Sequence, residues 1–277
     1  GKERTVAPPA PLSWYPEKMA FSFALSTPEL KKISVFPEIL AFREFVVSEH
    51  EQGNINRQEA VSMIPPLLLQ VEPHHTVLDM CAAPGSKTQQ LIEALHTNNF
   101  LYSHAMCAPT GFVVANEIDQ KRAHLLVHQL KRTGTCHFMV TNHPAQSFPK
   151  LFSDLEAHRD PADKAAIEAN SARWHGGQEL TSKHTHVIRF DRVLCDVPCS
   201  GDGTLRKCPT IWNTWSAQAG MGLHPLQIAI ATRGCQLLKV GGFLVYSTCS
   251  FNPIENEAVL AEVLRNTGES MELVDVR

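Results

Sequence analysis

The chain has 277 residues, 43% of them hydrophobic and 19% charged, and its formal net charge at pH 7 is -3. This size and composition are typical of a soluble globular protein with one large core, or with a main domain and a small appendage. The charge excludes an overall positive field that would mark a polyanionic partner, although Arg206 and Lys207 can supply local phosphate contacts.

Cysteine usage and the absence of long apolar runs narrow the class of protein further. Eight cysteines without a CxxC pair fit neither a disulfide framework nor a zinc ribbon, so we expect a reducing compartment and no metal site. No apolar run approaches the ~20 residues that a membrane span needs, and the first residues lack the pattern of a signal peptide. The chain does not begin with Met, which suggests an excised fragment.

Residues 1–54 are expected to form a small helical segment ahead of a larger domain over residues 55–277. Within the stretch SVFPEILAFREFVVSEH, the residues Ile39, Phe42, Val46 and Val47 approximate an apolar stripe with a period of about 3.6 residues. That spacing predicts a helix in this part of the chain.

From Thr76 onward, short apolar runs alternate with amphipathic stretches, which predicts a βαβ organisation. The apolar runs are TVLDM, GFVVANE, CHFMVTN, DRVLCDVP and GGFLVYSTCS, and the amphipathic stretches are SKTQQLIEALH, DQKRAHLLVHQLKR and HPLQIAIATRGCQLLK. Strands that are apolar throughout indicate a mostly parallel sheet with helices on both faces, and such sheets bind ligands at the carboxyl ends of their strands. The expected fold class is therefore α/β and Rossmann-like, with CAAPGSK, Glu117, DVPCSG and STCS converging on one edge.

Two further segments complete the outline of the chain. Residues 155–185 are polar, rich in Ala, His and charge and poor in β-branched apolar residues, so they are expected to form a flexible insertion rather than a functional lid. The last helix is expected to have Asn252 as its N-cap, Pro253 at its first position and Glu255 at the capping-box position. A helix that begins there would also help to ionise Cys249.

The stretch LDMCAAPGSKT is a candidate cofactor loop between a strand and a helix. Its small residues and Gly85 let backbone N–H groups at the positive end of the helix approach a ligand closely. It is neither GxGxxG nor a Walker pattern, which favours a nucleoside with a short charged tail, such as S-adenosylmethionine, over a pyrophosphate. Asp79 or Lys87 can meet that tail, and Glu117, with Asp119 as the fallback, can accept hydrogen bonds from ribose hydroxyls. The alternative is a plain tight turn with Glu117 as a solvated carboxylate.

Cys199 in DVPCSG and Cys249 in STCS each follow an apolar run and lie where the chain turns, so either sulfur can face a cleft while being held rigidly. A single cysteine of this kind is more often a packed thiol. That interpretation is applied to Cys81, Cys107, Cys136, Cys195, Cys208 and Cys235.

A thiolate beside an adenosyl site suggests methylation of a pyrimidine. Sulfur adds to carbon 6 of cytosine and makes carbon 5 electron-rich enough to take the methyl group. Asp196, three residues before Cys199, can hydrogen-bond or protonate ring nitrogen 3, although a capping or turn carboxylate is the alternative. A second cysteine can assist release of the product, and the residues alone leave open which sulfur attacks.

The motifs LDMCAAPGSKTQQLIEAL, DVPCSGDGTLRK, LQIAIATRG and YSTCSFNPIENEAV together resemble the Nop/Sun-domain RNA cytosine-5 methyltransferases, especially their eukaryotic tRNA branch. The similarity extends to NINRQEAVSMIPPLLLQV ahead of the first strand but not to the insertion at residues 155–185. It implies an S-adenosylmethionine-dependent tRNA (cytosine-5) methyltransferase whose Rossmann-like catalytic domain occupies residues 55–277. It further implies an RNA partner, a monomeric state, and a location in the nucleus or, alternatively, the cytoplasm.

The resemblance also assigns roles to single residues. It implies that Cys249 is the nucleophile, that Cys199 assists product release, and that Asp196 serves as a base or a cofactor contact. The implied cofactor-binding residues are Cys81, Ala82, Ala83, Pro84, Gly85, Ser86, Lys87, Glu117 and Asp196. One position departs from the family, because Pro144 stands where the third motif carries Asp. Proline has no carboxylate and no N–H, so a contact to adenine is missing or comes from Asn142 or His143.

A cytosine in structured RNA must be unstacked before it can meet a buried thiol, at a cost of a few kcal/mol that phosphate contacts help to offset. Arg57, Arg206 and Lys207, together with Lys87, are the candidates for these contacts. Trp212 and Trp215 are expected in the core rather than stacked on a base. The rival function is a non-catalytic RNA-binding or assembly factor that keeps the fold, and DNA methylation is a weaker third.

Overall fold

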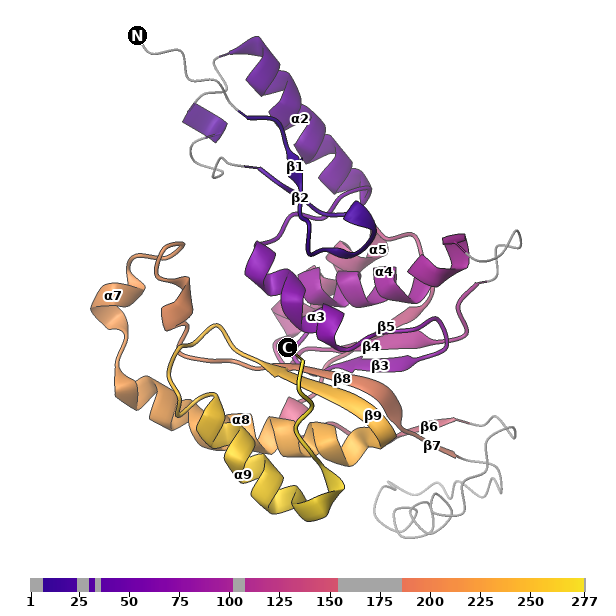
Figure 1. Cartoon of the computed structure of the whole chain (residues 1–277), viewed down its shortest axis with the longest axis vertical. Coiled ribbons are helices and arrows are strands. Elements are labelled where there is room, and N and C mark those ends of the chain that lie inside the picture. Colours follow the sequence, from indigo (N-terminus) through magenta and orange to yellow (C-terminus); the bar gives the residue numbers. More distant parts are fainter. Residues whose placement is uncertain (1–6, 24–29, 33–35, 102–107, 154–185, 277) are drawn as a thin grey trace. The chain divides into compact units, whose positions relative to one another are not determined.

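The computed structural model describes residues 7–23, 30–32, 36–101, 108–153 and 186–276 (Figure 1). It divides the chain into two compact units, Gly1–Met63 with Arg132–Gly134 and Ile64–Lys131 with Thr135–Arg277. The insertion expected at residues 155–185 and Cys107 lie outside the described residues. The domain boundary expected after residue 54 stays a prediction.

The described residues of the first unit include one long helix and two short strands. α2 (Pro37–Gln52) confirms the helix that the apolar spacing predicts; it begins at Pro37 and is followed by Gly53 in the left-handed conformation, with a φ of 85°. β1 (Ala10–Pro11) and β2 (Phe21–Ser22) pair antiparallel on either side of the short helix η1 (Pro16–Lys18), and η2 (Ala60–Met63) follows α2. The strands were not expected, because two residues are too few to display an alternation of apolar and polar side chains.

The second unit is built on a five-stranded parallel sheet, which confirms the expected fold class. Its strands are β3 (Thr76–Asp79), β4 (Phe112–Asn116), β5 (Phe138–Thr141), β8 (Phe190–Asp196) and β9 (Leu238–Ser247). Their order is β5-β4-β3-β8-β9, and every pair is parallel. The chain therefore builds the sheet outward from β3 to β5 and then returns to the other side of β3 to add β8 and β9. Sheets of this kind bind ligands beyond the carboxyl ends of the strands where the order reverses, here between β3 and β8.

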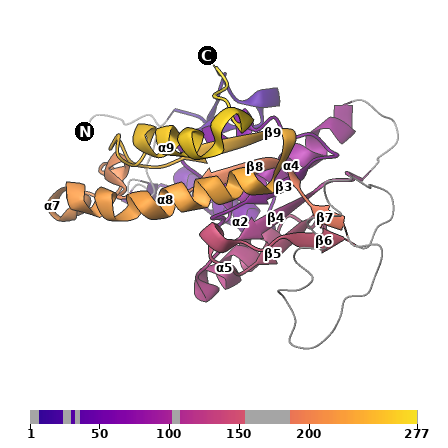
Figure 2. The same ribbon diagram turned by 90° about the horizontal axis from the view of Figure 1, so that it is seen from below.

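Helices cover both faces of the sheet (Figures 1 and 2). α3 (Ile64–Leu68), α4 (Ser86–Leu101) and α5 (Gln120–Lys131) lie on one side, and α8 (Ala217–Leu237) and α9 (Glu257–Thr267) lie on the other. Among the described helices, none is both long and apolar enough to cross a membrane.

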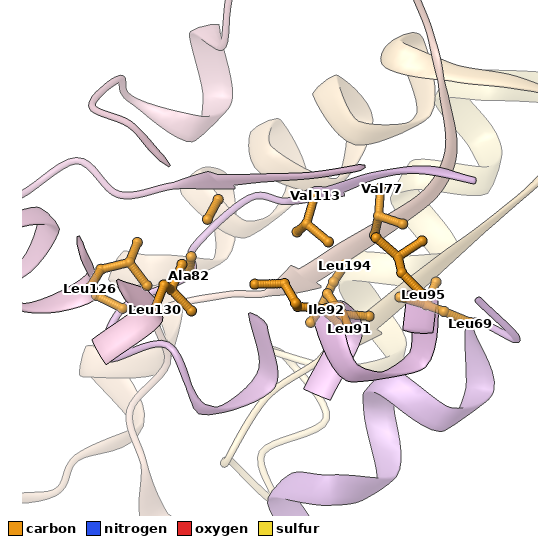
Figure 3. Packing of buried hydrophobic residues seen from close by; sticks show 12 residues of the cluster. Leu69, Val77, Ala82, Leu91, Ile92, Leu95, Val113, Leu126, Leu130 and Leu194 are labelled. Carbon is orange, nitrogen blue, oxygen red and sulfur yellow. The ribbon is translucent and has the colours of Figure 1, made fainter. Parts of the chain in front are cut away.

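Successive residues of β3, β4 and β8 enter different cores. Figure 3 shows the first core, where Leu91, Ile92 and Leu95 of α4 and Leu126 and Leu130 of α5 pack together with strand residues. The strand residues of this core are Val77, Val113 and Leu194, and their chain neighbours Leu78, Val114 and Val193 belong to the second core, beneath α8. Because both faces are buried, the strands are apolar at consecutive positions, which explains the continuous runs in the sequence.

Smaller elements connect the strands. η3 (Ala145–Ser147) follows β5, and β6 (Leu151–Ser153) pairs antiparallel with β7 (His186–Ile188) just before β8 begins. η4 (Asp202–Thr204) and α7 (Ile211–Thr214) lie between β8 and α8, and η5 (Gly268–Ser270) follows α9.

The last helix begins later than expected, so the predicted N-cap at Asn252 is wrong. α9 starts at Glu257 with Asn256 as its N-cap, whereas Asn252 closes a preceding turn by accepting the Glu255 N–H at 3.0 Å and the Ile254 N–H on Oδ1 at 3.1 Å. The Glu255 side chain does not return to Asn252 as a capping box requires, because other buried donors hold it. The positive end of a helix therefore does not begin at Asn252.

Candidate active site

The marked loops converge at the carboxyl edge of the sheet, as expected. Lys87, at the start of α4, forms an ion pair with Asp196 at the end of β8, with 2.7 Å between Nζ and Oδ2. Ser247, at the end of β9, donates to Asp196 Oδ1 at 2.7 Å. Arg122 of α5 donates to the Ala83 carbonyl at 2.7 Å and lies 3.5 Å from the Glu117 carboxylate. These contacts join the loops that follow β3, β4, β8 and β9.

The loop between β3 and α4 is compact and places its backbone close to neighbouring elements. Ala82, Ala83 and Gly85 are buried, Pro84 is exposed, and the Ala83–Pro84 peptide bond is cis. Gly85 has a φ of 110°, a backbone conformation that favours glycine, and a Cβ there would lie 2.9 Å from Leu126 Cδ1, so that this side chain would have to shift. Ser86 and Lys87 then open α4, and the N-terminal end of a helix suits a ligand's negative group.

Asp79 offers a buried carboxylate at the end of β3. Burial, assisted by the nearby charge of Asp196, raises the pKa of Asp79 to about 7, while the hydrogen bond from Thr88 at 2.7 Å acts in the opposite direction. Its Oδ1 is buried and accepts no well-formed hydrogen bond from the described residues, although the Cys81 N–H is near enough to lower the pKa. A buried carboxylate with spare acceptor capacity fits the ammonium group of an S-adenosylmethionine tail.

Glu117 is only 3% exposed, so the alternative of a solvated loop carboxylate is wrong. Its Oε1 accepts the Asp119 N–H at 3.0 Å. Asn142 donates from Nδ2 to the Glu117 carbonyl at 2.6 Å. Asn142 is one of the two residues suggested to replace the family's Asp at the position of Pro144, and this bond connects it to the loop after β4. Pro144 itself is exposed and precedes η3, and the His143 N–H donates to Asn116 Oδ1 at 3.1 Å.

The cysteines of the DVPCSG and STCS motifs lie in contact. Cys199 Sγ and Cys249 Sγ are 3.2 Å apart as free thiols, and the Cys249 N–H also donates to Cys199 Sγ at 3.2 Å. The hydrogen bond from the Cys199 thiol lowers the pKa of Cys249 to about 7 against the opposing effect of burial. The same hydrogen bond, together with burial, raises the pKa of Cys199 far above its ordinary range. Cys249 is also the more exposed of the two, so this geometry favours Cys249 as the thiolate.

The remaining cysteines divide by exposure. Cys195 is buried and Cys81 and Cys235 are partly buried, and burial raises the pKa of each, as expected for packed thiols. Cys136 and Cys208 are exposed, so the packed-thiol interpretation is wrong for these two. Both lie in connecting segments, where no second layer covers them.

Three further residues hold the cysteine loops and were not recognised as a group in the sequence. Ser200 and Ser250 each follow a cysteine, and both donate to the buried carboxylate of Glu255. The only sequence signal was the repeated Cys-Ser pair, because Glu255 reads as a capping residue of a helix.

The candidate RNA contacts occupy different places. Arg206 and Lys207 are exposed on the segment after η4, which continues the loop that carries Cys199. Arg57 is exposed and belongs to the first compact unit, so it is described apart from the cysteines.

The expected burial of the two tryptophans is wrong. Trp212 is 78% exposed and Trp215 is 38% exposed, and Phe251, two residues after Cys249, is 79% exposed. Trp212 lies on α7, which has four residues and stands outside the sheet layers, so its side chains do not reach either core. Trp215 donates from Nε1 to Ser200 Oγ at 2.8 Å. Exposed aromatic rings therefore accompany the loops that carry the two thiols.

Comparison with known proteins identifies a matching family and several similar chains. A family model described as 16S rRNA methyltransferase RsmB/F matches residues 66–277. The multisite-specific tRNA:(cytosine-C(5))-methyltransferase of Saccharomyces cerevisiae is 49% identical over 267 residues, which are 96% of this chain and 34% of that protein. The tRNA (cytosine(34)-C(5))-methyltransferase of Drosophila melanogaster is 44% identical over 267 residues, 96% of this chain and 32% of that protein.

Solved structures agree with these matches. A methyltransferase homolog protein from Pyrococcus horikoshii is 27% identical, with a TM-score of 0.54 over 89% of this chain and 58% of that one. NSun6 from the same organism, solved with SFG, is 22% identical, with a TM-score of 0.56 over 79% of this chain and 44% of that one, and it supports the fold alone. The chain spans about a third of the length of the curated eukaryotic relatives that it matches.

Proposed function

We propose, from the premise that the chain belongs to the RsmB/F methyltransferase family, that it transfers a methyl group from S-adenosylmethionine to carbon 5 of cytosine in RNA. The observation that carries the proposal is the contact of Cys199 and Cys249 at the sheet edge where the loop after β3 also ends. The printed names of the yeast and fly relatives support tRNA as the substrate.

The residues of the first loop fit S-adenosylmethionine, which when bound supplies a methyl group carried on a positively charged sulfur. Asp79 would face the ammonium of the tail, and Glu117 would accept hydrogen bonds from the ribose hydroxyls. The backbone from Cys81 to Gly85, followed by Ser86 and Lys87, would line the rest of the site. Asn142, whose side chain donates to the Glu117 carbonyl, is the proposed replacement for the Asp that the family carries at the position of Pro144.

Cys249 acts first on the cytosine in the proposed reaction. Its thiolate forms a bond to carbon 6, and the electron pair of the C5–C6 double bond moves into the ring, toward nitrogen 3 and carbon 5. Asp196, which pairs with Lys87 and is near enough to Cys249 to affect its ionisation, would in its protonated form donate its proton to nitrogen 3 as negative charge develops there. Carbon 5 would then bond to the methyl carbon, while the bond from that methyl group to the positively charged sulfur breaks and leaves its electron pair on the sulfur.

Release of the product reverses the addition. The proton on carbon 5 leaves to a base, the C6–S bond breaks, and its electron pair returns to the Cys249 sulfur as the C5–C6 double bond forms again. Cys199, 3.2 Å from that sulfur, assists this elimination in our proposal. Asp196 remains the alternative base.

The RNA must present an unstacked cytosine to the thiols. Arg206 and Lys207 would contact phosphates beside the cysteine loop, with Arg57 as a contributor from the first unit. The exposed rings of Trp212 and Phe251 would stack on unpaired bases. We further propose that the protein acts as a monomer and that this reaction takes place in the nucleus.

Incubation with tRNA and methyl-labelled S-adenosylmethionine tests the proposal. We expect label in 5-methylcytosine after nuclease digestion and chromatography, and none with Cys249→Ala. Calorimetry with S-adenosylmethionine separates the rival function: RNA binding without cofactor binding and without label would identify a non-catalytic RNA-binding factor.

A further inference from the structure

One carboxylate ties the two cysteine loops together. The Glu255 side chain is fully buried, and its Oε2 accepts the Ser200 hydroxyl at 2.5 Å and the Ser250 hydroxyl at 2.7 Å. Its Oε1 accepts the Ser200 N–H at 2.8 Å. Ser200 directly follows Cys199 and Ser250 directly follows Cys249, so a single side chain spans the loops after β8 and β9.

α8 closes this network from the opposite side. Gln227 is fully buried and donates from Nε2 to the Pro198 carbonyl at 2.9 Å and to Glu255 Oε1 at 3.1 Å. The peptide groups on both sides of Cys199 are therefore held, one by Gln227 and the other by Glu255. Such a network leaves the cysteine backbone few alternative positions.

The network requires an ionised acid at position 255. Burial alone would raise the pKa of Glu255, but hydrogen bonds from Ser200, Ser250 and Gln227 lower it below its usual range. Every group that contacts the carboxylate oxygens is a donor, so its charge-assisted hydrogen bonds are stronger than neutral ones. An amide at this position would turn its own N–H groups toward other donors.

We infer that Glu255 is a positioning residue that holds the sulfur atoms of Cys199 and Cys249 in contact. Its carboxylate contacts neither sulfur and acts through Ser200 and Ser250. The inference rests on the proposed function. In that reaction the contact between the two sulfur atoms determines which thiol is ionised when the cytosine arrives.

The contact can be measured through the ionisation of Cys249. The hydrogen bond from Cys199 has the largest effect on this thiol and lowers its pKa; burial and Asp196 raise the pKa, and a backbone hydrogen bond and Lys87 lower it. Asp196 and Lys87 keep their places when Glu255 is changed, because their ion pair and the Ser247 hydrogen bond do not involve it. A change in the pKa of Cys249 therefore reports on the contact with Cys199.

The test measures the alkylation rate of Cys249 by iodoacetamide as a function of pH, by mass spectrometry of the Cys249 peptide. The variant is Glu255→Gln, and the matched control is Glu257→Gln, which removes the same charge from an exposed residue two positions away. We expect a midpoint near 7 in the unchanged protein and in the control. In Glu255→Gln the midpoint should move toward ~8.5, the value of a free cysteine, with an alkylation rate at neutral pH about tenfold lower.

A folded Glu255→Gln protein with an unchanged midpoint would overturn the inference. If that variant does not fold, Ser200→Ala replaces it, because this change removes one hydroxyl and leaves the bonds of Glu255 to Ser250 and Gln227; an upward shift supports the inference and no shift refutes it. Alkylation needs neither RNA nor S-adenosylmethionine. A shifted midpoint in a protein without methyl transfer would therefore refute the proposed function and leave Glu255 as the residue that positions the thiols.

Discussion

At the scale of single residues, the two thiols differ in what their loss would leave behind. Cys249→Ala removes the sulfur whose pKa lies near 7, so in the proposed reaction no bond to RNA should form and methyl transfer should stop. Cys199→Ala keeps that sulfur but removes its partner at 3.2 Å, so addition should proceed and elimination should stall. We expect a slowly migrating protein–RNA adduct on denaturing gels with Cys199→Ala alone. An adduct with Cys249→Ala would reverse the two roles.

Asp79 gives the cofactor-free protein a measurable pH dependence. Its pKa in the folded state is about 7, above the ordinary aspartate value of 3.8, so between these values the folded state holds a proton that the unfolded chain has lost. The free energy of unfolding therefore decreases as pH rises through this window, by ~1.4 kcal/mol per pH unit and about 4 kcal/mol in total.

Asp79→Asn tests this dependence, because an amide does not ionise. We expect the difference in unfolding free energy between variant and unchanged protein, measured by urea denaturation, to move in favour of the variant from acidic to alkaline pH. A constant difference across the window would show that Asp79 has an ordinary pKa. The absolute stability of the variant is not the readout, because its new N–H group is itself buried.

At the scale of elements, the strands of the parallel sheet were predictable, and so was the last helix, but not the residue at which that helix begins. Consecutive apolar residues such as Val113 and Val114 reflect burial on both faces, and that pattern survives in any parallel sheet. The start of α9 depends instead on Glu255, whose partners Ser200 and Gln227 are 55 and 28 positions away in the chain. A local capping pattern cannot report such distant donors.

Gly220 of α8 lies against this network, so we expect its replacement by alanine to have an unusual effect on stability. A Cβ at Gly220 would lie 2.3 Å from Asn252 Nδ2 and 2.9 Å from Glu255 Oε2. Gly→Ala within a helix ordinarily stabilises by up to ~1 kcal/mol. Here we expect Gly220→Ala to destabilise instead, by about 1–3 kcal/mol, as overpacking does.

Gly222 is the matched control on the same helix. A Cβ there meets nothing within 4 Å, so Gly222→Ala should gain the helix-propensity stabilisation. Thermal unfolding of the two variants measures the difference. Equal shifts of the melting temperature would mean that the loop beside Gly220 adapts without cost.

At the scale of the whole molecule, some features of the candidate site could be predicted from the sequence and others could not. The convergence of four loops follows from parallel strands ending at one edge, and short motifs mark each loop. The exposure of Trp212 was not predictable, because it depends on α7 standing outside the layers of the sheet. The ionisation of Cys249 depends on a contact with Cys199, across 50 positions of the chain. Sequence therefore predicts where the site lies better than how its groups are charged.

A net charge of -3 means that affinity for RNA depends on a few local contacts rather than on the field of the whole protein. Each phosphate contact contributes about 0.7 to the slope of log affinity against log salt for single strands. Replacing Arg206 and Lys207 together by alanine should therefore reduce that slope by about 1.4. Arg265→Ala, on the exposed face of α9, serves as the control and should leave the slope unchanged.

The same salt titration of RNA affinity separates the contribution of aromatic stacking from that of the phosphate contacts. Trp212→Ala should weaken binding at every salt concentration without changing the slope, because stacking releases no counterions. Phe152→Ala removes an exposed ring on β6, in the hairpin that precedes the start of β8, and should change neither affinity nor slope. Fluorescence anisotropy with an unpaired RNA oligonucleotide measures both quantities. If the slope of log affinity against log salt does not change when Arg206 and Lys207 are replaced, the phosphate contacts lie elsewhere than beside the cysteine loop.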